Sequence, residues 1–291
     1  MGSPHGAALS AEDFGLKGPR GWAFRGVGFT APPGSLVAVE GPSGSGRTCL
    51  LLALTGRMRS TQGHAEVGGE RLPGRLAAVR RFSALGPVPG VSELDPSFTV
   101  AEHLRERALL RRRFDGSPRS LLRPRAERAA AARATVNGAL EAAGLDVAAL
   151  PKAERTSVRD LERLEALRLS VALALMGRPR LLAVDDTDLK LSVTDRALAW
   201  ELLRGLAADG TTVLAVCSEA PEDALTVRTR PAAHTEPARE EPAREEPAEE
   251  EQGREEPADE DDEPAAETSE GDTTTGNGKG TADAIAEAGR A

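Results

Sequence analysis

The chain has 291 residues and a formal net charge of −9, with 40% hydrophobic and 3% aromatic residues. This length suits one large domain or two small ones, and the scarcity of aromatic side chains leaves Leu, Val and Ala to form a core. The two cysteines exclude a disulfide framework and a cysteine-based metal site, and no apolar run reaches the roughly 18 residues of a membrane span. Without a secretory signal pattern at the N-terminus, the sequence predicts a reduced, cytoplasmic setting.

The first predicted unit consists of a strand, a loop and a helix. Ser35–Glu40 is a short apolar run of strand length, Gly41–Gly46 is rich in glycine, and Thr48–Leu54 favours a helix. A strand that ends in a glycine-rich turn before a helix is the arrangement of a phosphate-binding loop.

Residues 101–150 contain no strand candidate and carry ten arginines among Ala, Leu and Glu. We interpret this stretch as a helical insertion. Its arginines fit two explanations. They cover solvent-facing helix surfaces in an arginine-rich protein, or they form a basic patch that contacts an anionic partner.

Two further apolar runs, Leu181–Val184 and Thr211–Cys217, have the length of buried strands. Each follows a segment with helical character, at Asp160–Met176 and Thr194–Ala207 respectively. Near-continuous apolar strands that alternate with helices predict an α/β domain on a mostly parallel sheet.

The C-terminal segment 231–291 has 20 acidic and 5 basic residues, which leaves 32 basic and 26 acidic residues in the rest of the chain. Its apolar residues are almost all Ala, and Glu-Pro-Ala-Arg-Glu occurs twice, at 236–240 and 241–245. Such a composition buries too little surface to offset the entropy of ordering. We therefore predict a folded domain over residues 1–229 and a disordered acidic tail over residues 230–291.

The sequence GPSGSGRT at residues 41–48 matches G-x-x-x-x-G-K-[ST] except that Arg47 replaces the lysine. Glycines let backbone N–H groups wrap around phosphate oxygens, and the start of the next helix adds its positive dipole end. Arg47 keeps a positive charge in planar form, and Thr48 offers a hydroxyl to Mg²⁺. A chance glycine-rich turn is the weaker alternative. The predicted phosphate-binding residues are Gly41, Pro42, Ser43, Gly44, Ser45, Gly46, Arg47 and Thr48.

Two carboxylates, Asp185 and Asp186, follow the apolar run Leu181–Val184. In P-loop NTPases such a strand lies beside the phosphate loop, and its acid helps to hold Mg²⁺. A second acid can orient or deprotonate the attacking water. We predict Thr48 and Asp185 as Mg²⁺ ligands and Asp186 as the catalytic residue; the alternative is that the acid pair caps a following helix.

Three segments resemble those of ABC-transporter ATP-binding proteins. Pro32–Gly56 is similar to the family's phosphate-loop region, Ser97–Leu104 to the segment after its glutamine loop, and Ala172–Leu182 to the helix before its second acidic motif. The resemblance covers about residues 14–227. It implies a P-loop NTPase fold of ABC ATPase type with a helical subdomain at about 91–160. It also implies ATP and Mg²⁺ as cofactors, a homo- or heterodimer of nucleotide-binding domains, and a membrane-spanning partner on a separate chain.

The chain also departs from the family pattern. Leu161–Glu165 stands where the family carries Leu-Ser-Gly-Gly-Gln, Ser218 aligns with a histidine, and Asp186 aligns with the catalytic glutamate. Gly90 falls near the glutamine loop, and Trp22 is the aromatic residue nearest to the adenine-stacking position. Losing one group that positions the transition state costs about 10²–10⁴-fold in rate. We therefore expect ATP binding, with hydrolysis weak or lost unless a partner supplies the missing groups.

Two other functions stay open at this point. One is a soluble nucleotide-dependent regulatory or interaction protein that has the ABC fold and no transport role. The other is a nucleic-acid-associated ATPase, which the lack of aromatic stacking platforms makes the weakest of the three. Under the transporter hypothesis, the cytoplasmic protein would also be peripheral at the inner face of the cell membrane.

Overall fold

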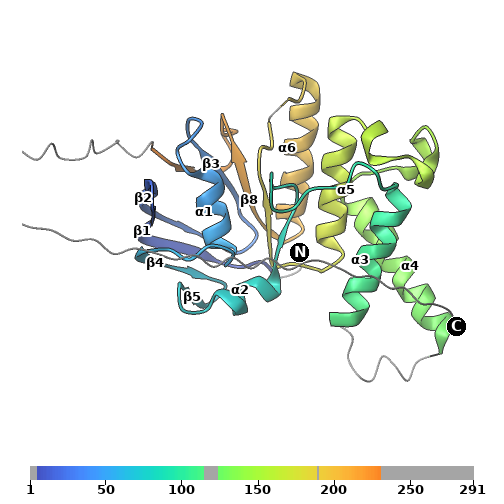
Figure 1. The fold of residues 1–291 in the computed structure, drawn as a ribbon, viewed down its shortest axis with the longest axis horizontal. Helices are drawn as coiled ribbons and strands as arrows, with labels where there is room; N and C mark the ends of the chain where they lie inside the picture. The colour runs from blue at the N-terminus through green and yellow to red at the C-terminus, as the bar shows by residue number, and fades with distance from the viewer. Residues whose placement is uncertain (1–4, 115–123, 189, 231–291) are drawn as a thin grey trace, which may run out of the picture. The chain divides into compact units, whose positions relative to one another are not determined.

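The computed structural model describes residues 5–114, 124–188 and 190–230. This part of the chain contains a parallel sheet, an antiparallel sheet and the helices that pack on them (Figure 1). The predicted disordered tail falls outside the described residues, except for Arg230.

The parallel sheet lies at the centre of the α/β domain. Its strands are β3 (Leu36–Glu40), β6 (Ser83–Leu85), β7 (Leu181–Val184), β8 (Thr212–Cys217) and β9 (Leu225–Arg228). Their order across the sheet is β6-β7-β8-β3-β9, and every neighbouring pair is parallel. All residues of β7 and β8 are buried, which explains their continuous apolar sequences because both faces of the sheet are covered.

The prediction of an α/β domain on a mostly parallel sheet is confirmed. The predicted helix at 48–54 is α1 (Arg47–Leu54), and the one at 194–207 is α6 (Val193–Ala208). The helix expected at 160–176 is α5, but it spans Arg163–Leu175 because a 3₁₀ turn ends at Asp160 and Glu162 occupies the N-cap.

The antiparallel sheet was not predicted from the sequence. Its strands are β1 (Leu9–Gly18), β2 (Gly21–Ala31), β4 (Gln62–Val67) and β5 (Glu70–Leu72), in the order β2-β1-β4-β5. Register shifts interrupt the pairing of β1 with both β2 and β4. Bulges of this kind break the strict alternation of polar and apolar residues that identifies an antiparallel strand in a sequence.

Helix α1 packs between the two sheets (Figure 1). Five consecutive residues of this helix, Leu50 to Leu54, are buried. They share one core with Phe14 and Phe24 of the antiparallel sheet and with Val37 and Val39 of β3. A helix covered on all sides is apolar on all sides, which explains the run of leucines after the phosphate loop.

The remaining helices are α2 (Leu76–Phe82), α3 (Val100–Phe114) and α4 (Arg125–Ala142). Helices α5 and α6 cover the face of the parallel sheet opposite α1, through a core that includes Leu167, Val171 and Leu203. Residues of α3, α4 and α5 form a further small core around Val100, Leu104 and Leu169 (Figure 1). None of the helices in the described ranges combines the length and the apolar character needed to cross a bilayer.

Candidate nucleotide-binding site

The loop between β3 and α1 requires glycine at two positions. Gly44 and Gly46 both have φ of 80°, in the left-handed region that L-residues disfavour. At Gly46 a Cβ atom would lie 1.9 Å from the backbone oxygen of Ala23 on β2. The loop conformation therefore depends on the glycines that the sequence pattern singled out.

Ser45 fixes this loop to the end of the domain. Its buried hydroxyl lies 2.7 Å from Oγ1 of Thr229, and the backbone N–H of Thr229 donates to the oxygen of Glu40 at 2.9 Å. The backbone N–H of Ser45 donates to the oxygen of Pro42 at 3.2 Å. The N–H and the hydroxyl of Ser45 thus both have partners within the protein. Sequence reasoning listed Ser45 for phosphate binding and missed its contact with Thr229.

Arg47 reaches across the site from the first residue of α1. Its Nη1 donates to the backbone oxygen of Cys217, the last residue of β8, at 2.6 Å. A guanidinium has five N–H donors, so this bond holds the side chain in place and leaves further donors on the same group. The positive charge lies between the phosphate loop and the C-terminal end of β8.

Thr48 and Asp185 meet at the C-terminal ends of the strands. Thr48 Oγ1 donates to Asp185 Oδ2 at 2.7 Å across 137 residues of sequence, and the N–H of Asp186 donates to Asp185 Oδ1 at 3.0 Å. Burial raises the pKa of Asp185, with a smaller contribution from the neighbouring Asp186, while the Thr48 hydrogen bond acts in the opposite direction. Only 2% of Asp185 is exposed, so its ionised form would be favoured by a nearby cation.

The pair Thr48 and Asp185 is a suitable donor set for Mg²⁺, because this ion prefers hydroxyl and carboxylate oxygens. Within the described ranges no group of three His, Cys, Asp or Glu side chains is placed to hold a metal alone. Mg²⁺ commonly completes its shell with water and substrate phosphate oxygens, so two protein ligands are compatible with it.

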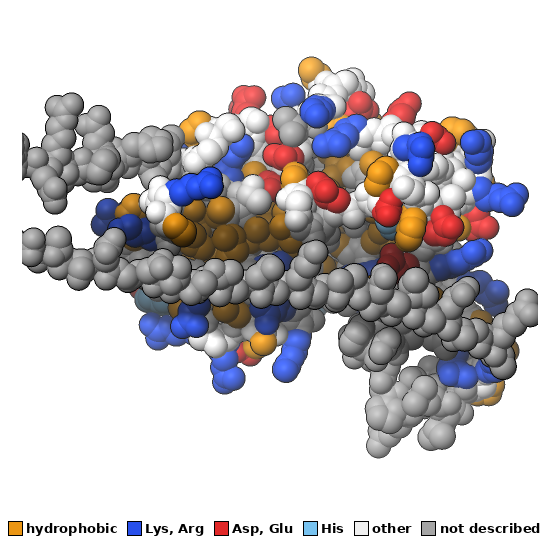
Figure 2. Space-filling model, in the orientation of Figure 1, with side chains coloured by type: hydrophobic (Ala, Val, Ile, Leu, Met, Phe, Trp, Pro, Cys, Tyr) orange, Lys and Arg blue, Asp and Glu red, His pale blue; other side chains and the backbone are white. Residues whose placement is uncertain are grey.

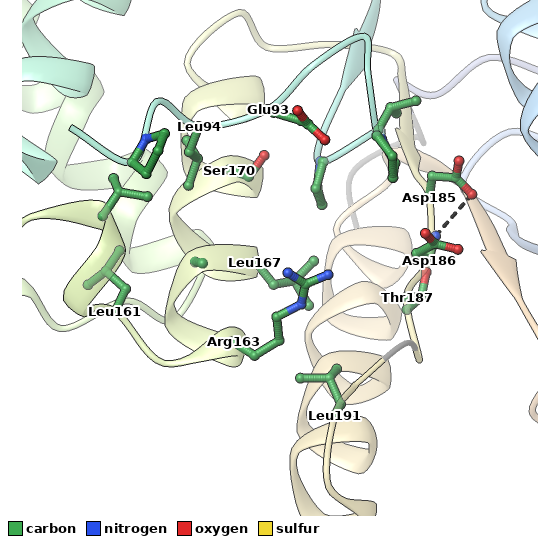
Figure 3. Close-up of a pocket in the computed structure, with 16 residues that line it drawn as sticks. Glu93, Leu94, Leu161, Arg163, Leu167, Ser170, Asp185, Asp186, Thr187 and Leu191 are labelled. Atoms are coloured by element: carbon green, nitrogen blue, oxygen red, sulfur yellow. Dashed lines mark hydrogen bonds between the residues drawn. The ribbon is translucent and has the colours of Figure 1, made fainter. Parts of the chain in front are cut away.

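Asp186 lines a cavity of about 590 Å³ between the parallel sheet and α5. It has φ of 49°, an uncommon backbone conformation for a residue other than glycine. Figure 3 shows Glu93, Arg163 and Asp186 around this cavity, on three different elements. The hydroxyl of Thr187, at the cavity wall, is buried without a hydrogen-bond partner among the described residues. The carboxylates of Glu93 and Asp186, the guanidinium of Arg163 and the unpaired hydroxyl of Thr187 therefore border one cavity, beside the Asp185 carboxylate.

The segment Leu161–Glu165 forms the start of α5, with Glu162 as the N-cap. Glu162 and Glu165 form a capping box, in which the Glu165 carboxylate accepts from the Glu162 N–H at 2.8 Å. The helix start is therefore occupied by two carboxylates of its own chain, and its positive dipole end is already compensated.

Ser218 lies directly after β8 and is held by Asp188. The Ser218 N–H donates to Asp188 Oδ2 at 2.8 Å, and Asp188 is buried. Sequence reasoning missed Asp188, although it belongs to the same acidic run as Asp185 and Asp186. An acid four residues after the end of a buried strand was the available signal.

Trp22 lies on β2, directly before Ala23, whose oxygen faces the phosphate loop. Its ring is contacted by Arg25 at 4.9 Å and by Lys17 at 5.7 Å from the centroid. Cations at these distances interact favourably with an indole ring. Trp22 is thus an aromatic group with neighbouring positive charge beside the phosphate loop, whereas Gly90 lies in a loop with φ of 72° and lines no part of the 590 Å³ cavity.

This fold and this site define a P-loop nucleotide-binding domain of the ABC class. Residues 24–188 match the family model of the ABC transporter, and this chain belongs to that family.

Curated relatives include Nod factor export ATP-binding protein I of Ralstonia nicotianae, 34% identical over 189 residues that cover 65% of this chain and 52% of the relative. The protein of the same name from Burkholderia pseudomallei is 35% identical over 65% of this chain and 55% of the relative. The chain therefore spans about half the length of the curated relatives it matches.

Two solved structures share the fold. The dimeric structure of MJ0796, a bacterial ABC transporter cassette, has a TM-score of 0.58 with 20% identity, covering 77% of this chain and 94% of that one. A bacterial Atm1-family ABC exporter with ATP bound has a TM-score of 0.57 with 18% identity, covering 79% of this chain and 38% of that one.

Proposed function

We propose that this chain is the ATP-binding subunit of a transport system and binds Mg-ATP at residues 41–48. The observation that carries the proposal is the hydrogen bond between Thr48 and Asp185, which joins the phosphate loop to the acid after β7. Family membership and the printed names of the relatives, which describe export ATP-binding proteins, support it.

The chain's own groups would hold the phosphates in a defined way. Backbone N–H groups of the glycine-rich loop and the start of α1 face the anion, and no acidic residue in the first turn of α1 opposes it. Arg47 exchanges its bond to the Cys217 oxygen for the phosphate oxygens, which a guanidinium binds as a planar fork. Thr48 and Asp185 hold the Mg²⁺, which neutralises phosphate charge when bound.

We infer that the isolated chain hydrolyses ATP slowly. The start of α5 presents carboxylates where the family resemblance places donors to the γ-phosphate of a second subunit. Ser218 replaces the histidine, and Asp186, one methylene shorter than glutamate, stands at the position of the catalytic acid. A partner with a complete signature would restore a site built around this chain's phosphate loop.

The proposed partners are a second nucleotide-binding domain and a membrane-spanning subunit on a separate chain, at the inner face of the membrane. Affinity purification from detergent-solubilised membranes tests this part. Recovery of a membrane-spanning protein supports it, whereas exclusive recovery of soluble proteins favours the regulatory alternative.

Thermal denaturation with and without Mg-ATP tests the binding. At a nucleotide concentration of 100 times Kd, linkage adds about 2.7 kcal/mol to the free energy of unfolding. We expect a clear rise in Tm for the native chain and no rise for Arg47→Ala. The matched control is Arg133→Ala, an exposed arginine on α4, which should respond like the native chain. A native Tm that is unchanged at millimolar Mg-ATP contradicts the proposal.

A further inference from the structure

A second cavity, of about 260 Å³, lies between the end of α2, the second half of α3 and the turn that precedes β7. It borders the start of β6, whereas the phosphate loop follows the end of β3 in the same parallel sheet, so the two sites lie at opposite ends of the strands of that sheet. Figure 2 shows Lys and Arg side chains along the edge where β5 and α2 lie in Figure 1. Among the described residues no Asp or Glu lines the cavity. Its charged wall consists of Arg80, Arg81, Arg107 and Arg111.

Main-chain carbonyls hold the guanidinium groups of Arg80 and Arg107 in place. Arg80 Nη1 donates to the oxygen of Gly56 at 3.1 Å, and Arg107 Nε donates to the oxygen of Leu173 at 3.1 Å. A neutral carbonyl orients a guanidinium without cancelling its charge, and each group keeps several further N–H donors. Arg80 and Arg107 are thus fixed in position while their charges stay available.

Arg57 lies behind the cavity and adds to the positive charge. It donates to the Thr55 oxygen at 2.8 Å and to the hydroxyl of Ser83, a residue of the cavity wall, at 2.9 Å. Burial, with smaller contributions from the charges of Arg80 and Arg107, lowers the pKa of Arg57 to about 10.

None of the ion pairs between side chains of the described ranges involves Arg57, Arg80, Arg81 or Arg107. A general excess of arginine in this chain explains exposed arginines with solvated charges. It does not explain a partly buried Arg57 next to other arginines, because like charges at short range destabilise a fold unless an anion offsets them. The crowding of positive charge without a carboxylate therefore indicates an anion from outside the described chain.

We propose that this cavity, the arginine pocket lined by Arg80, Arg81 and Arg107 with Arg57 behind its wall, binds a multiply charged oxyanion of the phosphate type. Planar guanidinium forks match the oxygens of phosphate, and several positive charges favour an anion of charge −2 or more over a single carboxylate. The volume of 260 Å³ equals about nine water molecules at ~30 Å³ each, enough for one or two phosphate groups. The anion is a free phosphate compound or the headgroup of a phosphate-bearing lipid.

Calorimetric titration of the full chain with sodium pyrophosphate, without Mg²⁺ and at low salt, tests the proposal. The Arg47→Ala background reduces binding at the phosphate loop. We expect saturable binding that becomes roughly tenfold weaker or more when Arg80→Gln and Arg81→Gln are added, since each charge-assisted hydrogen bond to an anion contributes strongly. The Arg81 side chain makes no hydrogen bond to a described residue, so its replacement should leave the fold intact. Arg133→Gln is the charge-matched control and should leave the affinity unchanged.

Two vesicle preparations identify the source of the anion. A lipid headgroup is the ligand if the protein binds vesicles with phosphatidic acid but not pure phosphatidylcholine vesicles. This binding should be lost in Arg81→Gln and should be competed by pyrophosphate, and this result supports the pocket. Pyrophosphate binding without any vesicle binding supports it with a free phosphate compound as ligand.

Two results overturn the proposal. One is equal pyrophosphate affinity in the native and the Arg80→Gln/Arg81→Gln proteins. The other is binding of poly-glutamate but not of pyrophosphate, which would assign the arginines to an acidic protein partner. The Tm response to Mg-ATP should persist in Arg81→Gln, so a failure here is distinguishable from a failure of the proposed ATP binding.

Discussion

Two helices of this chain, α1 and α5, begin beside the candidate site, and their first turns meet an anion in opposite ways. Helix α1 follows Gly46, has no side-chain cap and has no acidic residue in its first turn. Helix α5 follows Glu162, and its first turn contains Glu165 in a capping box. Both helix starts have the same positive dipole, so the difference lies in which groups satisfy it. The start of α1 keeps its N–H groups for a phosphate, whereas carboxylates of the chain itself satisfy the start of α5.

The two helix starts thus separate the groups that would bind the nucleotide phosphates from those that would support hydrolysis. The elements that would bind nucleotide converge around α1 and the end of β7, where Thr48 contacts Asp185. The elements that would complete a second subunit's site gather around α5 and Ser218, where the donors are already occupied by Glu165 and Asp188. The following variants test each side of this contrast, in order of decreasing expected effect.

The largest effect is expected for Gly46→Ala at the start of α1. Its Cβ would overlap the Ala23 oxygen at 1.9 Å in a left-handed backbone, so we predict a loss of more than about 3 kcal/mol in the free energy of unfolding. Gly44→Ala is the control, because it has the same φ of 80° and no atom within 4 Å of the added Cβ. It should lose only about 1–2 kcal/mol. Urea unfolding measures both, and equal losses would mean that the contact with Ala23 has no role.

A medium effect is expected at the start of α5. Glu165→Ala removes the acceptor of the Glu162 N–H and should lower the free energy of unfolding by about 1 kcal/mol. Glu165→Gln keeps an acceptor at the same place and should remain close to the native stability, since both residues serve in a capping box. Thermal denaturation compares the two. An unchanged Tm for Glu165→Ala would show that the cap does not stabilise the helix.

A smaller, pH-dependent effect is expected for Asp185→Asn. The folded protein raises the pKa of this carboxyl, so folding favours its neutral form, and this contribution is lost as pH rises through the folded pKa. Asparagine keeps an acceptor for Thr48 and does not ionise. The stability of Asp185→Asn relative to the native chain should therefore increase from about pH 4 to neutral pH, without nucleotide.

Denaturant unfolding at both pH values checks this sign. The same variant should lose its Tm response to Mg-ATP, because a Mg²⁺ ligand is gone. A native chain that gains stability relative to Asp185→Asn as pH rises would contradict the assignment of a buried, disfavoured charge.

The smallest effect is expected for Asp186→Asn on ATP turnover. The isolated chain should turn over ATP well below about one per second, the lower end of typical enzyme rates. Removing the Asp186 carboxylate should then change the rate little, because groups that act as a unit are not additive once others are missing. A phosphate-release assay measures both proteins. Turnover at one per second or faster that Asp186→Asn abolishes would show that Asp186 is a working base.

The sequence by itself determined the α/β class, the position of the phosphate loop and the family. These follow from local signals: an apolar strand, closely spaced glycines and an acid pair after a buried run can all be recognised within about ten residues. The boundaries of β3 and β7 were close for the same reason. The predicted first residue of α5 was wrong by three, because Asp160 lies in a separate 3₁₀ turn that the sequence does not reveal.

Only the tertiary structure decided which distant groups meet. Ser45 and Thr229 are 184 residues apart, and no local pattern encodes their contact. Thr48 and Asp185, 137 residues apart, were expected near one Mg²⁺ from their two motifs, but their direct hydrogen bond appears only in the folded chain. The antiparallel sheet escaped prediction because its bulged strands lack a regular period. Arg57, Arg80 and Arg107 looked like scattered arginines in the sequence, yet folding places them around one cavity. The reason is physical: hydrogen bonds and charges act over a few ångströms of space, whereas the sequence specifies proximity only along the chain.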